Sequence, residues 1–138
     1  MDSINTEYLQ RYIETLEKSY EMIKTAKEGS IEYEMFRNSL VKGFEMTLDQ
    51  SGKLLKKKLI PYFASKKIAD TLVFKDIFRN ALKHSLLDEE TVNRWFLYRD
   101  NRNNTAHDYG VKFAKETLTL IESFLTDAKN LKKVIDNE

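Results

Sequence analysis

The scarcity of residues that interrupt helices constrains this chain most. Its 138 residues include only four glycines and one proline, well below the usual contents of about 7% and 5%. Between these residues, apolar side chains recur every three to four positions, which places them on one face of a helix. No alternating pattern typical of strands competes with this period. The sequence therefore predicts an all-α fold, an antiparallel bundle of four or five helices in a single domain over residues 1–138.

Boundary residues divide this pattern into five helices. The first three helices are predicted over residues 4–27, from after Ser30 to Pro61, and over residues 74–82. The fourth runs from Asp88 into the polar stretch 98–110, and the last from Phe113 to the carboxyl end. Ser3 and Asp88 are the expected N-caps of the first and fourth helices, because a short polar side chain can accept a hydrogen bond from the first turn. A polar linker over residues 65–70 separates the second helix from the third.

Composition also restricts the chemistry that is open to the chain. The absence of cysteine excludes disulfides, cysteine-based zinc sites and iron–sulfur clusters, and two histidines are too few for a histidine-rich metal site. We therefore expect neither a metal nor a cofactor. The net charge of +1 argues against a constitutive DNA-coating protein, although it leaves room for a local basic groove.

Two kinds of segment are missing from the sequence. The amino-terminal residues contain no apolar stretch of signal-peptide length, and no run of about 18 apolar residues occurs anywhere. We expect a cytoplasmic protein that does not enter a membrane.

The segment from Arg99 to Tyr109 contains the residues best suited to catalysis. It places two arginines, three asparagines, a threonine, a histidine and a tyrosine in eleven positions. Histidine titrates near neutral pH and can both take and give a proton, while the forked guanidinium of arginine suits a phosphate. Arg102 and His107 are together a minimal set for cleaving a phosphodiester with a ribose 2′-hydroxyl as the nucleophile.

The spacing of these two residues creates a geometric problem. On an unbroken helix, Arg102 and His107 would point about 140° apart. They can act on one phosphate if the helix loosens between them, or if this segment from two chains meets across a two-fold axis. Arg99 lies on the same helix face as Asn103 and His107, and so competes with Arg102 for the phosphate role. A polar helix end that only caps neighbouring helices explains the spacing equally well.

The stretch from Arg102 to Tyr109 resembles the Arg-x4-His-x-Tyr motif of the HEPN superfamily, in the branch of HepT-type toxins and nucleotidyltransferase substrate-binding proteins. Further segments are similar to that branch: Phe44-Glu45-Met46-Thr47, Asp76 to Lys83, Leu86-Leu87-Asp88 and Trp95. The resemblance covers most of residues 36–130. One residue departs from it, because Gly52 stands where the branch usually has a tryptophan.

The resemblance implies a HEPN-like helical homodimer in which two motifs meet at the interface and form a metal-independent endoribonuclease. It also implies a minimal nucleotidyltransferase as antitoxin, which in some pairs adds adenylate to the tyrosine of the motif. Carried onto this chain, Arg102 and His107 are the catalytic pair, Asn103 and Arg99 support them, and Tyr109 is the candidate adenylylation site. The alternative is a non-catalytic binding or regulatory subunit of a nucleotidyltransferase.

Charge is distributed unevenly along the chain. Residues 53–67 contain no acidic residue and six lysines: Lys53, Lys56, Lys57, Lys58, Lys66 and Lys67. Residues 1–34 carry eight acidic against four basic side chains. We expect Lys53, Lys56, Lys57 and Lys58 to bind RNA or an acidic partner. Solvated lysines at a helix end are the alternative.

Overall fold

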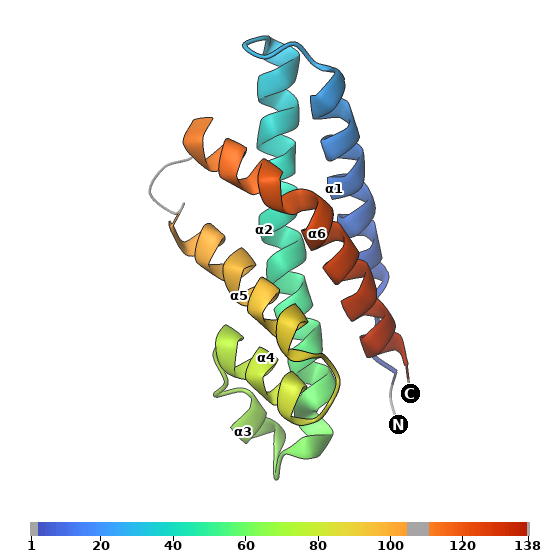
Figure 1. Ribbon diagram of the computed structural model, residues 1–138. Helices are drawn as coiled ribbons and strands as arrows, with labels where there is room; N and C mark the ends of the chain where they lie inside the picture. The colour runs from blue at the N-terminus through green and yellow to red at the C-terminus, as the bar shows by residue number, and fades with distance from the viewer. Residues whose placement is uncertain (1–2, 105–110, 138) are drawn as a thin grey trace.

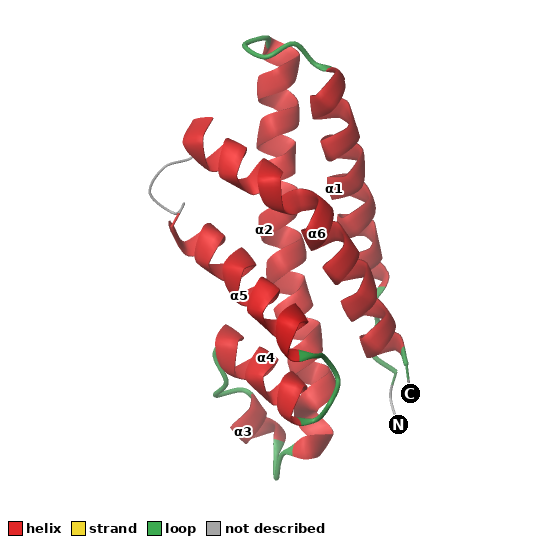
Figure 2. Ribbon diagram, in the orientation of Figure 1, coloured by secondary structure: helices red, strands yellow, loops and turns green. Residues whose placement is uncertain are grey.

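The computed structural model describes residues 3–104 and 111–137, and these residues form an all-α bundle, as predicted (Figures 1 and 2). No strand occurs within the described ranges. The helices are α1 (Glu7–Thr25), α2 (Ile31–Leu59), a 3-10 turn (Ile60–Tyr62), α3 (Lys66–Ala69), α4 (Phe74–Lys83), α5 (Glu89–Asn104) and α6 (Val111–Asp136).

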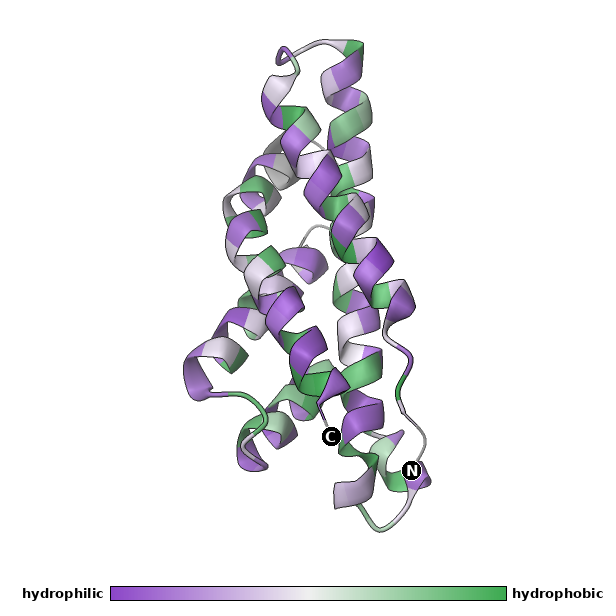
Figure 3. Ribbon diagram, turned by 90° about the vertical axis from the view of Figure 1, so that its right-hand side faces the viewer, coloured by the Kyte–Doolittle hydropathy of each residue, from purple (hydrophilic) through white to green (hydrophobic). Residues whose placement is uncertain are grey.

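The long α2 helix is the centre of the arrangement. It forms an antiparallel hairpin with α1, and α6 lies diagonally across both helices (Figure 1). The shorter α4 and α5 pack against the carboxyl-terminal half of α2, and α5 runs antiparallel to α6. Figure 3 shows hydrophilic and hydrophobic residues alternating along the long helices, as expected where one face is buried and the other meets water.

Side chains cap the starts of α2 and α5, and one of these caps, Asp88, was predicted from the sequence. The Ser30 hydroxyl accepts a hydrogen bond from the backbone N–H of Tyr33 at 3.1 Å. The Asp88 carboxylate likewise accepts one from the N–H of Thr91 at 2.8 Å. A hydrogen bond from the Thr91 side chain, followed by the one from its backbone N–H, lowers the pKa of Asp88. Both side chains therefore satisfy a backbone donor that the helix itself leaves unpaired.

The predicted start of the first helix was wrong. The helix begins at Glu7, with Thr6 rather than Ser3 at its N-cap position. The Thr6 hydroxyl does not cap the helix but donates to Asp136 near the end of α6, at 2.6 Å. The local hydrogen bond at this start comes from Asn5 and not from Ser3, because Asn5 Oδ1 accepts from the N–H of Glu7 at 2.9 Å.

The linker predicted over residues 65–70 contains a single helical turn. Ser65 caps this α3 turn by accepting a hydrogen bond from Ile68 N–H at 3.3 Å, and Ala69 is buried beneath it. A stretch of four residues is too short for a hydrophobic period to reveal it.

The core joins four helices through aromatic side chains. The five largest fully buried residues are Trp95, Tyr98, Phe44, Phe78 and Phe124, from α2, α4, α5 and α6. Trp95 stacks on Phe78 with ring centroids 4.9 Å apart, and meets Tyr98 and Phe124 edge-on. Burying a side chain of this size stabilises the fold by about 1.5–3 kcal/mol, so this cluster fixes α5 against the rest of the bundle.

Gly52 allows the close contact between α2 and α4. The helix continues through this buried residue, and a Cβ placed on it would lie 2.9 Å from the Phe74 ring. The Phe74 ring thus occupies the space beside α2 at this position. The departure at residue 52 therefore reflects a local repacking in which Phe74 fills the volume that a larger residue would need.

Candidate functional site

The described end of α5 presents part of the predicted catalytic segment. Arg99 and Arg102, hereafter the arginine pair, are both partly exposed, and Asn103 is exposed. His107 and Tyr109 lie outside the described residues, and their placement stays a prediction. The geometry of the site is therefore built from the arginines and the side chains around them.

Two carboxylates on α2 face the arginine pair. Glu45 and Asp49, hereafter the carboxylate pair, are one helical turn apart, as the two arginines nearly are on α5. Arg102 Nη2 lies 3.6 Å from Glu45 Oε2, and its Nε lies 3.6 Å from Asp49 Oδ1. Arg99 Nη1 approaches the same Asp49 oxygen at 3.5 Å. One carboxylate of α2 is thus shared by both arginines.

The two carboxylates differ in exposure. The side chain of Glu45 is 16% exposed and that of Asp49 is 52% exposed, while Arg102 lies between them at 29%. All three N–O distances exceed the 2.7–2.9 Å typical of charge-assisted hydrogen bonds. Water and salt screen the Asp49 contacts much more than the Glu45 contact.

Arg99 is additionally held by α4. Its guanidinium carbon lies 5.1 Å from the centroid of the Phe74 ring, within the range of a cation–π contact. The same ring packs on Gly52. The carboxylate of Asp49 on α2 and the ring of Phe74 on α4 therefore hold the Arg99 side chain between these two helices.

Two more contacts anchor this end of α5. Asn101 Nδ2 donates to the hydroxyl of the buried Thr117 on α6 at 3.1 Å. Asp100 pairs with Lys75 on α4 at 2.9 Å. Side chains of α5 between residues 99 and 102 thus reach three different helices, so the backbone that leads to the predicted catalytic residues is fixed from three directions.

A buried polar network lies in the preceding turns of α5. Asp127 of α6 is 2% exposed and accepts hydrogen bonds from Arg94 and from the Tyr98 hydroxyl. Burial raises the pKa of Tyr98, and the hydrogen bond to Asp127 raises it further. The hydrogen bond to Asp127 also raises the pKa of Arg94. Tyr98 is thus a neutral donor, and the charge of Asp127 is balanced by Arg94.

Sequence reasoning missed several of these residues. Asp127 sits within the apolar stripe of the last helix, and that position was the available signal of a buried, paired carboxylate. In the sequence, Glu45 stands out only as part of the Phe44-Glu45-Met46-Thr47 segment. Its pairing with Arg102 needs the spatial arrangement of α2 and α5.

The structure divides the four predicted RNA- or partner-binding lysines into two groups. Lys53 and Lys57 are exposed, and they follow Asp49 by one and two helical turns of α2. Lys56 instead pairs with Asp70 at 3.4 Å. Lys58 donates to the backbone carbonyls of Ile135 and Asn137, where the carboxyl-terminal end of α6 attracts a cation.

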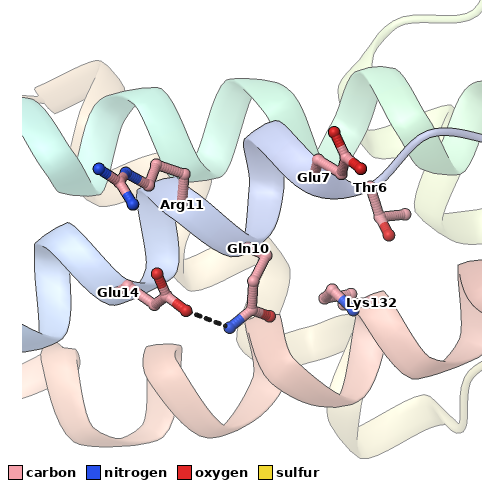
Figure 4. Close-up of a pocket in the computed structure, with 6 residues that line it drawn as sticks. All are labelled: Thr6, Glu7, Gln10, Arg11, Glu14 and Lys132. Atoms are coloured by element: carbon pink, nitrogen blue, oxygen red, sulfur yellow. Dashed lines mark hydrogen bonds between the residues drawn. The ribbon is translucent and has the colours of Figure 1, made fainter.

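Two hollows occur on the described surface away from the arginine pair. One, of about 310 Å³, lies between α1 and the end of α6, where Gln10 donates to Glu14 at 3.0 Å (Figure 4). The other, of about 760 Å³, adjoins Lys57, Tyr62 and Ser85. Neither is lined by residues of the arginine or carboxylate pair.

Residues 3–104 and 111–137 contain no group of three or more His, Cys, Asp or Glu side chains arranged to hold a metal ion. Within the same ranges, no helix combines the length and the apolar character needed to cross a membrane.

Comparisons with known proteins agree with the fold. Residues 5–137 match the family described as nucleotidyltransferase substrate binding protein like. A protein of Haemophilus influenzae named "Probable ribonuclease HepT" is 27% identical over 134 residues, 94% of this chain and 90% of that relative. The solved structure of HI0074 from Haemophilus influenzae, presented as the fold of a substrate binding domain of a nucleotidyltransferase, matches with a TM-score of 0.79 and 25% identity. That match covers 95% of this chain and 98% of HI0074. This chain therefore belongs to the nucleotidyltransferase substrate binding protein like family, the HepT-type branch of the HEPN superfamily.

Proposed function

We propose that this protein is a metal-independent endoribonuclease, the toxin of a pair whose antitoxin is a minimal nucleotidyltransferase. The observation that carries the proposal is the setting of Arg102. Its side chain is partly exposed, faces two α2 carboxylates, and stands on a helix end that contacts three other helices. A relative named as a probable ribonuclease supports the same activity.

The chemistry assigns one role to each residue of the motif. His107 takes the proton of a ribose 2′-hydroxyl, whose oxygen then forms a bond to the adjacent phosphorus as the bond to the 5′-oxygen breaks. A histidinium returns a proton to that leaving oxygen, and the products are a cyclic 2′,3′-phosphate end and a 5′-hydroxyl end. Arg102 stabilises the charge that develops on the phosphate, and Asn103 orients the pair.

A homodimer resolves the angular separation of Arg102 and His107. If the motif segments of two chains face each other, Arg102 and both copies of His107 reach a common phosphate, and one histidine serves as base while the other serves as acid. The exposed Lys53 and Lys57 continue along α2 from the carboxylate pair. We assign these two lysines to contacts with the RNA backbone.

Adenylylation of Tyr109 would regulate this activity. Adenylate added to Tyr109 would place a bulky anion two residues from His107 and repel the RNA phosphate. The partner nucleotidyltransferase is the enzyme that would add it. Incubating the protein with that partner and ATP should raise its mass by one or more adenylates, whereas Tyr109→Phe should stay unmodified.

The activity is tested with pure protein and a labelled RNA in excess chelator. The wild-type protein should cut the RNA, while Arg102→Ala and His107→Ala should not. Arg79→Ala is the matched control, because Arg79 is an exposed arginine of α4 that pairs with Asp76 in its own helix. Cutting that survives both motif substitutions, or that disappears with chelator, would refute the mechanism. Sedimentation of the wild-type protein as a monomer would refute the composite site.

A second function is favoured by the names of the family and of the HI0074 domain, which refer to substrate binding. In that case the motif segment is a docking surface for a nucleotidyltransferase. Stable copurification with that enzyme, combined with RNA that stays uncut by the isolated protein, would support this function over the first.

A further inference from the structure

We propose that the carboxylate pair positions Arg102 through two different tasks. Glu45 orients the guanidinium throughout the reaction, and Asp49 occupies the phosphate position until RNA displaces it. The inference rests on the proposed ribonuclease function and concerns residues outside the Arg-x4-His-x-Tyr motif.

Glu45 is mostly buried beside Arg102. Its side chain is 84% removed from solvent, and it lies 3.6 Å from Arg102 Nη2. A carboxylate at such a depth loses much of its hydration, so separating it from the guanidinium would leave a poorly solvated charge. Glu45 therefore keeps its contact with Arg102 when substrate arrives, and this contact fixes the direction of the guanidinium plane.

Asp49 is much more exposed than Glu45. About half of its side chain is exposed, and it meets Arg102 Nε at 3.6 Å. An exposed carboxylate returns to water at little cost, and ion pairs of this kind contribute little to stability. A phosphate carries the same charge and offers more acceptor oxygens, so it can replace Asp49 beside the guanidinium.

Asp49 has a second partner, Arg99, that it keeps after the phosphate has displaced it from Arg102. Its Oδ1 already lies 3.5 Å from Arg99 Nη1, and Arg99 is held over the Phe74 ring. When the phosphate takes Arg102, Asp49 keeps Arg99 as its partner and no charge is left unpaired. Arg99 thus acts on the substrate indirectly, as the residue that retains the displaced carboxylate.

These different roles of Glu45 and Asp49 predict that two conservative substitutions change different kinetic parameters. Asp49→Asn removes the competitor of the phosphate, so RNA should bind several-fold more tightly and KM should fall. Glu45→Gln removes the charge that orients Arg102, so kcat should fall about tenfold without a rise in KM. A purely structural role would only lower the fraction of folded protein, so kcat is calculated per folded molecule, with the folded fraction taken from unfolding curves; a kcat that is then unchanged indicates a structural role.

Binding is measured with a fluorophore-labelled single-stranded RNA oligonucleotide on a His107→Ala background, in which the RNA is not cut. Asp49→Asn should strengthen binding there, and Asp76→Asn should not, although both remove one exposed negative charge from a helix. The gain should vanish when Arg102→Ala is added. Unchanged or weaker binding by Asp49→Asn, or an equal gain with Asp76→Asn, would overturn the exchange.

Cleavage kinetics test Glu45. A lower kcat with KM not raised supports the orienting role, and a higher KM with kcat unchanged overturns it. Thermal unfolding identifies a Glu45→Gln protein that does not fold, in which case the Asp49 binding experiment alone decides the proposal. If the wild-type protein cuts no RNA in any preparation, the proposed function fails. If it cuts and Asp49→Asn behaves like the wild-type protein, only this inference fails.

Discussion

Arg94 of α5 contacts both carboxylate oxygens of Asp127 of α6, through Nε at 2.8 Å and through Nη2 at 2.9 Å. The two parallel hydrogen bonds fix the rotation of α5 about its axis as well as its position along α6. The Tyr98 hydroxyl adds a third donor to the same carboxylate. Arg99 and Arg102 follow within the next turn, so the direction in which they point is set by this buried network.

Asp127→Ala should lower the free energy of unfolding by about 1–3 kcal/mol, because Arg94 and the Tyr98 hydroxyl lose an acceptor. The loss is limited because the Arg94 side chain is 39% exposed and Tyr98 keeps Ser123 as a partner at 2.9 Å. Thermal or denaturant unfolding measures the loss. Glu17→Ala is the matched control, since Glu17 pairs with Lys129 on the exposed surface and should cost no more than about 1 kcal/mol. Similar losses in both variants would mean that the buried network does not hold α5 on α6.

Two glycines of α2 should respond oppositely to alanine. At Gly52, a Cβ would lie 2.9 Å from the Phe74 ring, so Gly52→Ala should destabilise the protein by about 1–3 kcal/mol despite its better helix propensity. At Gly43, the nearest atom is Leu16 Cδ1 at 3.4 Å, an ordinary contact. Gly43→Ala should therefore be neutral or stabilise by up to about 1 kcal/mol. Chemical denaturation of both variants measures the difference, and equal responses would contradict the packing of Phe74 on Gly52.

Lys57 and Lys58 should separate RNA binding from stability. Lys58 donates to backbone carbonyls at the end of α6, so Lys58→Ala should reduce stability by about 1 kcal/mol. Lys57 is exposed, and Lys57→Ala should leave the melting temperature unchanged while weakening RNA binding and its salt dependence. Melting curves and RNA titrations at several salt concentrations measure both effects. An unchanged affinity in Lys57→Ala would remove this lysine from the RNA surface.

Stability should depend on pH through Asp136. Burial acts to raise the pKa of this carboxyl, but hydrogen bonds from Lys132 and Thr6 outweigh it, and the net shift is downward. A carboxyl whose pKa is lower in the folded than in the unfolded state stabilises the fold above its unfolded pKa, and this contribution is lost as pH falls through the folded pKa. Asp136→Asn should therefore melt below the wild-type protein at about pH 7, and the difference should shrink below about pH 4. A difference that is constant with pH would contradict the ionic origin of the contact.

The all-α class, the order of the longer helices and the N-cap at Asp88 were predictable, because each depends on residues close together in the sequence. The start of the first helix was not predicted correctly, since Thr6, at its N-cap position, donates a hydrogen bond to Asp136 of α6, 130 positions away in the sequence. The single turn at α3 was missed for a different reason, because its four residues are fewer than a hydrophobic period requires.

The sequence by itself determined which residues could carry phosphodiester chemistry, since a histidine and an arginine near each other in a polar segment are recognisable without a fold. Only the tertiary structure decided what surrounds Arg102. Glu45 and Asp49 precede it by more than fifty residues, and they face it because buried aromatic rings and Asp127 hold α5 against the other helices. The number of residues between two charged side chains does not reveal whether they form an ion pair, because Coulomb attraction depends on their distance in space. Folding alone brings these charges within a few ångströms of one another.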